Sequence, residues 1–246
     1  MTTHQEIENL AMRGMSIKRK FYLSYDTYIR SISCFIMFST VALSIYSGKY
    51  GMMTLLSFVS FFSCFEWFGL WATTHNTSNP WSLKILFLGF LYLGFSLYCL
   101  GNLGFYYPMH FFHVAITTWA TDIFSYIIGV KLKSLEWFIS VHLGQGKTWP
   151  GFWGGLLFGT LIPFVLFSGV ESHYHLSNSL KNLFFKTLAL SFFSQIGDIT
   201  ESIIKRFASK KDSSTFCFHI PGHGGVLDRI DGLLLASCVC YLYKEF

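Results

Sequence analysis

Charge is almost absent from a long stretch in the first half of the chain. In residues 31–130 only Lys49, Glu66, Lys84 and Asp122 carry a formal charge. Over all 246 residues, 13% are charged and 52% are hydrophobic, whereas a soluble globular domain is about 25% charged. This composition excludes a water-soluble globular domain, and it also excludes disordered, collagen-like and disulfide-scaffold chains. The chain is therefore predicted to be a polytopic membrane protein.

The apolar runs are continuous rather than alternating, which favours helices, because an open sheet cannot satisfy its edges in lipid. A helix needs roughly 20 apolar residues to cross the hydrocarbon. The fourth run is long and contains Pro108, so it could form two elements. We predict an all-α polytopic integral membrane protein with about seven transmembrane helices, and eight or nine stay open. The predicted spans are 31–47, 51–73, 83–100, 105–130, 151–170, 183–199 and 228–243.

Lys and Arg residues gather in three segments that lie outside the predicted spans. These are the N-terminal segment, the loop 131–149 and the segment 200–227. Seven spans place all three segments on one side of the membrane, and their positive charge indicates that this side is the cytoplasm. One extra span before residue 131 would break this agreement, so seven or nine spans fit better than eight.

Three further sequence features do not indicate a catalytic or binding site. Gly151, Gly155 and Gly159 form a GxxxGxxxG row that lets helices approach closely, either inside the chain or between two copies. The six cysteines form no CxxC pair, and they are interpreted as free thiols in an apolar setting. The net charge of +5 is small and scattered, so nucleic-acid binding is not expected.

Weaker motifs favour structural roles. Lys147 and Thr148 resemble the end of a phosphate-binding loop, but the glycine spacing is wrong and no strand is expected before them. His110 and His113 have the spacing of metal ligands, but they lie among aromatic residues without a third ligand, which favours a satisfied or interfacial pair. Glu66 has two open interpretations: it pairs with a cation, or it lines a lipid entrance.

Charge concentrates instead near the C-terminus. Residues 196–231 hold ten of the 31 formal charges of the chain, with acids and bases interleaved. Asp198 and Asp228 adjoin predicted spans, and a charge at membrane depth is costly enough to indicate function. A structural ion pair or an interfacial residue is the alternative for each one taken alone.

The spacing of these charges places several of them on common helix faces. Asp198, Glu201 and Lys205, with Ser202 beside them, recur at helical spacing on one face. Asp228 and Asp231 are three residues apart and share a face at the start of the last span. The glycine-rich stretch 221–225 precedes them and allows close backbone approach to a ligand. Carboxylates, a glycine loop and basic residues together predict a Mg²⁺ site that holds phosphates.

The same residues carry a resemblance to a known family. The stretch Ser202-Ile-Ile-Lys205-Arg206, then Lys211-Asp212, then Pro221-Gly-His223-Gly-Gly-Val-Leu-Asp228-Arg229-Ile-Asp231 resembles the C-terminal signature of the phosphatidate cytidylyltransferases, or CDP-diglyceride synthases. Upstream, Asp122-Ile-Phe-Ser125-Tyr126-Ile-Ile-Gly129 and Lys147-Thr148-Trp149-Pro150-Gly151 are similar to two further elements of that family. The order and spacing agree over about residues 115–240.

The chain departs from the family pattern at several places, one of which is Gly144-Gln145, where the family has Ser-Pro. Ser125 stands where the family has Ala, and Pro150 stands where it has Glu. Three extra residues also lie between Asp212 and Pro221. The insertion is expected to reshape only a loop, whereas the loss of the Glu side chain affects whatever contact it makes in relatives.

The resemblance implies the reaction CTP + phosphatidate → CDP-diacylglycerol + pyrophosphate, a nucleotidyl transfer in phospholipid biosynthesis. Mg²⁺ is the implied cofactor, with a second, monovalent cation left open, and Asp198 and Asp228 are the implied metal ligands. The implied catalytic residues are Asp198, Ser202, Lys205, Arg206, Lys211, His223, Asp228, Arg229 and Asp231. The implied substrate-binding residues are Asp122, Lys147, Gly224 and Gly225.

The resemblance also implies an organisation of the chain and a location. We predict a cytoplasmic N-terminal segment at 1–30, N-terminal transmembrane helices at 31–130, and a catalytic transmembrane region at 131–246. The expected location is the bacterial cytoplasmic (inner) membrane, with the active site facing the cytoplasm and a homodimer left open. The alternatives are a CTP-dependent lipid kinase, a cytidylyltransferase acting on another membrane lipid, and, less favoured, a transporter.

Overall fold

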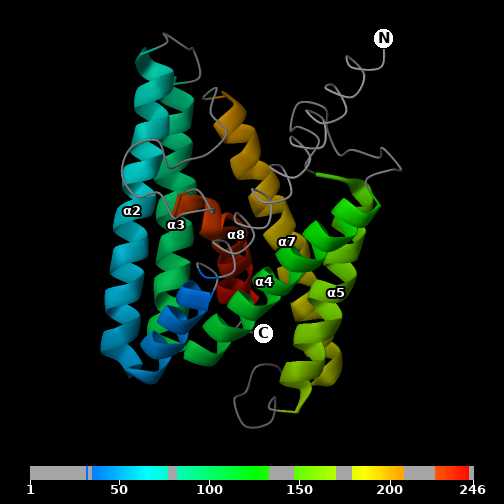
Figure 1. The fold of residues 1–246 in the computed structure, drawn as a ribbon. Helices are drawn as coiled ribbons and strands as arrows, with labels where there is room; N and C mark the ends of the chain where they lie inside the picture. Colours follow the sequence, from blue (N-terminus) through cyan, green and yellow to red (C-terminus); the bar gives the residue numbers. More distant parts are fainter. Residues whose placement is uncertain are drawn as a thin grey trace, which may run out of the picture.

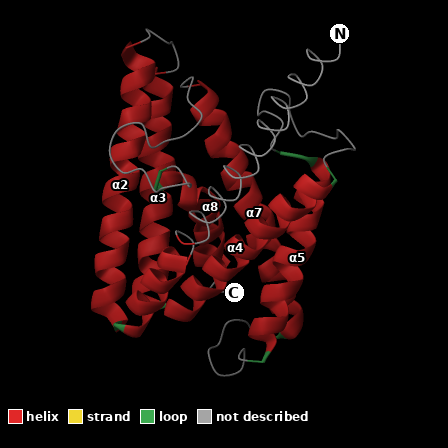
Figure 2. Cartoon of the chain, viewed as in Figure 1, coloured by secondary structure: helices red, strands yellow, loops and turns green. Residues whose placement is uncertain are grey.

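The computed structural model describes residues 32, 35–76, 82–132, 147–169, 179–207 and 225–243, and regular structure in these ranges is helical (Figures 1 and 2). A short helix, Phe35–Tyr46, comes first. The longer helices are α2 (Gly48–Asn76), α3 (Ser82–Tyr106), α4 (Pro108–Lys131), α5 (Trp149–Ser168), α7 (Leu180–Phe207) and α8 (Leu227–Tyr243). Each of the seven predicted spans therefore contains a helix.

Four of the described helices are long and apolar enough to cross a membrane. These segments are Gly48–Ala72, Leu86–Tyr106, Pro108–Lys131 and Trp149–Ser168. The protein is a polytopic helical membrane protein, and the predicted number of seven spans stays a prediction. The last two helices differ from these four because α7 carries several charges and α8 has only 17 residues.

Pro108 marks a helix start rather than a break inside a helix. It occupies the first turn of α4, where the missing backbone N–H has no intrahelical partner to lose. The preceding helix α3 ends at Tyr106. The predicted run 105–130 therefore contains the last residues of α3 and one continuous helix, α4.

The glycine row brings α4 and α5 together. A Cβ atom added at Gly155 would lie 2.9 Å from the carbonyl oxygen of Thr121, and one at Gly151 would lie 2.7 Å from that of Ser125. Real Cβ atoms do not approach backbone that closely, so these positions require glycine. Of the two interpretations of the row, packing inside the chain is confirmed.

Helix α8 lies inside the bundle and packs on α2, α3, α4 and α7 (Figure 1). It meets α7 where two glycines face each other: a Cβ at Gly197 would lie 2.6 Å from the carbonyl oxygen of Asp231 and 3.2 Å from the Cα of Gly232. The neighbours of this crossing in sequence are Asp198 and Asp231. Because glycines let the two helices cross closely, Asp198 of α7 and Asp231 of α8 lie near the same crossing.

Candidate active site

A polar cavity of about 390 Å³ lies where four helices meet. Its wall comes from the C-terminal half of α4, the start of α5, the C-terminal half of α7 and the first turn of α8. This volume is within the range of about 300–1,000 Å³ that is typical of ligand sites. Eight of the residues that the sequence predicts for the site line this cavity: Asp122, Lys147, Asp198, Ser202, Arg206, Asp228, Arg229 and Asp231.

Two further predicted site residues, Lys205 and Gly225, do not line the cavity but contact Asp228, which does. Lys205 Nζ is 2.6 Å from Asp228 Oδ1, and the backbone N–H of Gly225 donates to Asp228 Oδ2 at 2.9 Å. Asp228 is thereby held from both sides, by a lysine of α7 and by the backbone just before its own helix. Three other predicted residues, Lys211, His223 and Gly224, lie outside the described residues.

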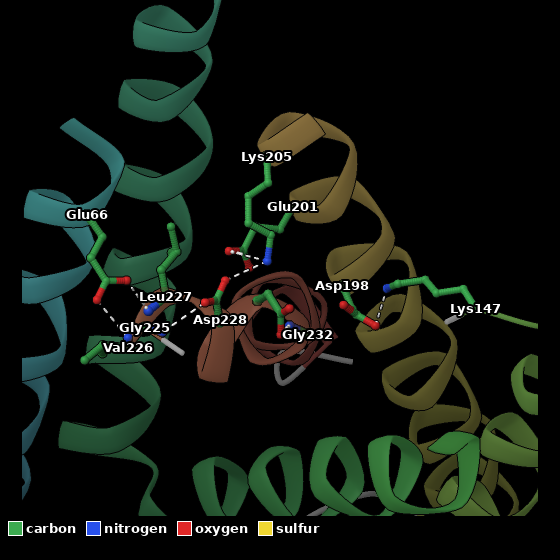
Figure 3. Close-up of polar contacts among 11 residues, drawn as sticks. Glu66, Lys147, Asp198, Glu201, Lys205, Gly225, Val226, Leu227, Asp228 and Gly232 are labelled. Carbon is green, nitrogen blue, oxygen red and sulfur yellow. Dashed lines mark hydrogen bonds and ion pairs between the residues drawn. The ribbon is translucent and has the colours of Figure 1, made fainter. Parts of the chain in front are cut away.

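Ion pairs tie the acidic residues to lysines from other elements (Figure 3). Lys147, just before α5, pairs with Asp198 of α7. Lys205 pairs with Asp228 and, at 3.4 Å, with Glu201 one turn earlier in its own helix. The side chains of Lys205, Glu201 and Asp228 are almost fully buried, so this cluster is shielded from solvent.

The sequence does not single out Thr148 as a site residue. It lines the cavity, and its Oγ1 accepts a hydrogen bond from Gly151 N–H at 3.2 Å, which makes it the N-cap of α5. A threonine directly before Trp149-Pro150 is the usual N-cap pattern, so the signal is present in the sequence. Pro150, the departure from the family pattern, occupies the first turn of this helix, where proline is well tolerated.

Glu66 is a second residue that the sequence leaves unassigned. It is fully buried in α2, and its two carboxylate oxygens accept the backbone N–H groups of Val226 and Leu227 at 2.8 and 2.9 Å. These donors lie at the start of α8. No sequence pattern predicts this contact, because its partners are 160 residues away along the chain.

The donor set of the cavity fits Mg²⁺ bound jointly with phosphates. Its acidic side chains offer hard oxygen ligands, and Mg²⁺ is commonly bound by one or two carboxylates completed by substrate phosphates. Among the described residues, no group of three His, Cys, Asp or Glu side chains is arranged to hold a metal by itself. Glu201 is not among the residues that line this cavity; its charge is paired with Lys205, although neither of its buried oxygens has a hydrogen-bond partner in the described part of the chain.

A second cavity, of about 590 Å³, adjoins the first. It lies among the short helix, α2, α3, α4 and α8, and its wall is almost entirely apolar. Arg229 alone carries a charge among its described lining residues, and the same side chain lines the polar cavity. The Nε atom of Arg229 is buried without a hydrogen-bond partner among the described residues. A donor without a partner therefore stands at the boundary of the two cavities.

The histidine pair lies away from these cavities. His113 is fully buried, its Nε2 lies 3.0 Å from Thr187 Oγ1, and its ring packs on Phe167. His110 packs against Tyr107. The Nδ1 atom of His113 is buried without a hydrogen-bond partner among the described residues, so the interpretation of a satisfied pair holds only for Nε2.

The fold and the cavity define a class: polytopic helical membrane proteins with a charged site at the meeting point of four helix ends. Comparison with known proteins identifies the family within that class. A model of the cytidylyltransferase family matches residues 75–246, and the chain belongs to this family.

Curated relatives are named phosphatidate cytidylyltransferase. The Staphylococcus epidermidis protein is 37% identical over 120 residues, which are 48% of this chain and 42% of that protein. The Brucella melitensis biotype 1 protein is 34% identical over 166 residues, covering 63% of this chain and 55% of that protein. The Staphylococcus saprophyticus protein is 34% identical over 154 residues, covering 62% and 53%. The chain spans about half the length of these relatives.

Proposed function

We propose that this protein transfers the cytidylyl group of CTP to phosphatidate. The observation that carries this proposal is the junction of the two cavities at Arg229. A phospholipid with an anionic headgroup matches both sides of that junction, since its acyl chains suit the apolar cavity and its phosphate suits the basic and acidic one. The family and the name of the relatives support the same reaction.

In this reaction a phosphate oxygen of phosphatidate attacks the α-phosphorus of CTP. The bond between the α-phosphorus and the bridging oxygen breaks, and pyrophosphate leaves with the bond electrons. The attacking phosphate is already anionic near neutral pH, so no strong general base is needed. The barrier comes from bringing two anions together, and fixed positive charge lowers it by electrostatic stabilisation.

The basic residues of the cavity are suited to that task in different ways. Arg206 and Arg229 line the cavity and can contact phosphate oxygens directly. Lys147 lines it as well and pairs with Asp198, so it links the nucleotide side of the site to α7. Lys205 pairs with Asp228 and Glu201 behind the wall, and we assign it to holding Asp228.

Asp198 and Asp228 would hold Mg²⁺, with Asp231 next to them. The metal supplies positive charge for the pyrophosphate leaving group. Asp198 and Asp228 are each paired with a lysine ammonium, and these two ion pairs support the proposal that the positions are negatively charged and suited to a cation. Ser202, His223, Gly224 and Gly225 are proposed to complete the phosphate cradle, with Lys211 as a further neutralising residue and Asp122 on the nucleotide side. A second, monovalent cation at the same site is a further proposal.

The test uses purified protein, phosphatidate and CTP labelled at one phosphate at a time. Label from the α-phosphate should enter chloroform-soluble lipid, and label from the γ-phosphate should leave as pyrophosphate. Transfer of the γ-label into lipid would instead identify a CTP-dependent lipid kinase. If neither label enters lipid, transfer to phosphatidate is overturned, and the same result with every lipid tested would favour a transporter. Replacing phosphatidate by other membrane lipids tests the remaining alternative, a different lipid acceptor.

We also propose that the active site faces the cytoplasm of a bacterial cell, because CTP is cytosolic and relatives are bacterial. Regions 1–30, 31–130 and 131–246 keep their proposed roles as N-terminal segment, N-terminal helices and catalytic region. Single cysteines at Ser134 and Ser209 in a cysteine-free background should then label from the same, cytoplasmic side. Labelling from opposite sides would contradict both this location and the seven-span arrangement. A homodimer stays a proposal.

A further inference from the structure

Glu66 connects an outer helix to the start of the helix that carries the site. It is 0% exposed in α2, and that helix otherwise presents mainly apolar and aromatic side chains. Its Oε1 accepts Val226 N–H and its Oε2 accepts Leu227 N–H (Figure 3). The residue lies outside the range 75–246 that the family model matches.

The partners of Glu66 are backbone N–H groups at the start of α8. The first N–H groups of a helix have no intrahelical acceptor, and the helix dipole adds positive charge there. Glu66 satisfies two of these groups from α2, while Asp228 accepts the N–H of Gly225 from within the same turn. The start of α8 is therefore held by two carboxylates that approach from different elements.

The same turn carries site residues. Leu227, which Glu66 binds, directly precedes Asp228 and Arg229 in the chain. Arg229 lines both cavities, and Val226 lines the apolar one. A shift of this turn would move the proposed metal ligand and the shared arginine together.

We propose that Glu66 is a positioning residue that fixes the first turn of α8 and thereby sets Asp228 and Arg229 in the site. The kinetic part of this inference rests on the proposed function, whereas the structural part does not. A buried carboxylate in an apolar helix is costly unless it is well paired, and here the start of α8 supplies the pairing.

The informative variant is Glu66→Gln. It keeps the size of the side chain but removes the charge and turns one acceptor into an NH₂ group that would face a backbone N–H. The matched control is Ser63→Ala, one turn earlier on α2. Ser63 is equally buried, and within the described ranges its hydroxyl donates inside its own helix, to the carbonyl oxygen of Val59.

Hydrogen exchange measured by mass spectrometry in detergent tests the anchor directly. In Glu66→Gln the peptide that covers Val226 and Leu227 should exchange faster, while peptides from α3 and α5 keep the exchange of the unmodified protein. Ser63→Ala should leave all of them unchanged. Unaltered exchange at 226–227, or a uniform rise across the protein, would overturn the proposal.

The kinetic readout separates positioning from loss of folded protein. In Glu66→Gln the Mg²⁺ concentration for half-maximal activity should rise about tenfold, in line with the about 10–100-fold effects of groups that support metal ligands. A smaller amount of folded enzyme would lower the maximal rate and leave that concentration unchanged, which would contradict positioning. If the unmodified protein forms no CDP-lipid, the proposed function fails, and the exchange measurement still decides the role of Glu66.

Discussion

The helix pairs α2–α3 and α7–α8 differ in where they place aromatic and charged side chains. The outward faces of α2 and α3 carry large aromatic residues, such as Phe61 and Phe87, and the most exposed phenylalanine among them is Phe90 of α3. In α7 and α8 the buried residues include charged ones, Glu201, Lys205 and Asp231. The first pair therefore turns aromatic surface outward and buries Glu66, whereas the second pair buries several charged residues.

Length and hydropathy separate these two helix pairs. Both α2 and α3 contain candidate spans by length and composition, whereas α7 and α8 do not. Yet α8 packs on four other helices and ten of its residues are buried. Its charges are tolerated because protein, rather than lipid, surrounds them and supplies partners such as Lys205 for Asp228. The two helices that are least typical of a membrane span therefore supply much of the candidate site, together with α4 and α5.

The largest effect is expected from removing the metal. Treatment with EDTA should abolish CDP-lipid formation, and added Mg²⁺ should restore it, because the acidic cavity leaves the phosphates' charge uncompensated without a cation. The measurement is incorporation of α-labelled CTP into lipid before and after chelation. The fold of both helix pairs should persist, which circular dichroism would check. Full activity in chelator would contradict the assignment of Asp198 and Asp228 as metal ligands.

The next largest effect is expected for Asp228→Asn in α8. Losing one electrostatic contact to a transition state costs about 10²–10³ in rate, so activity should fall at least about a hundredfold. The amide oxygen still accepts a hydrogen bond from Lys205, and Glu201 still pairs with that lysine, but the NH₂ group then faces the N–H of Gly225. The loss in stability should therefore be about 1–3 kcal/mol.

The comparison variant is Lys84→Gln in α3, which also removes one charge but from an exposed position. Its turnover should stay near that of the unmodified protein. Membrane yield and thermal unfolding are measured for both variants beside the rate. Near-normal turnover in Asp228→Asn would make Asp228 a structural ion-pair partner only.

The sequence predicts much of this arrangement. Continuous apolar runs predict where all seven described helices lie, and helical spacing with the family resemblance predicts eight residues that line one cavity. It does not predict the contacts between distant elements. Lys147 reaches Asp198, and Glu66 reaches Val226 and Leu227, only because the bundle brings those helices together. Pairing across the bundle depends on three-dimensional packing, which neither local spacing nor hydropathy encodes.

An intermediate effect is expected from glycine substitutions that contrast the two helix pairs. Gly197→Ala in α7 would place a Cβ atom 2.6 Å from the backbone oxygen of Asp231, so α7 and α8 must separate. Such overpacking typically costs about 1–3 kcal/mol. Gly94→Ala in α3 meets nothing within 4 Å, and it should leave stability unchanged or slightly raised, since Ala favours helix. Thermal unfolding in detergent compares them, and equal midpoints would contradict the close α7–α8 crossing.

The smallest effect is expected for Phe90→Ala on the outward face of α3. Phe90 is 81% exposed, so its ring has few protein contacts to lose. In lipid the acyl chains replace those contacts, because hydrocarbon is as apolar as the side chain. Stability should therefore change by less than about 0.5 kcal/mol, as for exposed sites in general, and turnover should be unaltered. Thermal unfolding and the CTP assay measure both in the same preparation. A loss above about 1 kcal/mol would mean that this face is covered by protein in the membrane. Cross-linking would then identify the covering chain, and a second copy would turn the open question of a homodimer into a surface on α3.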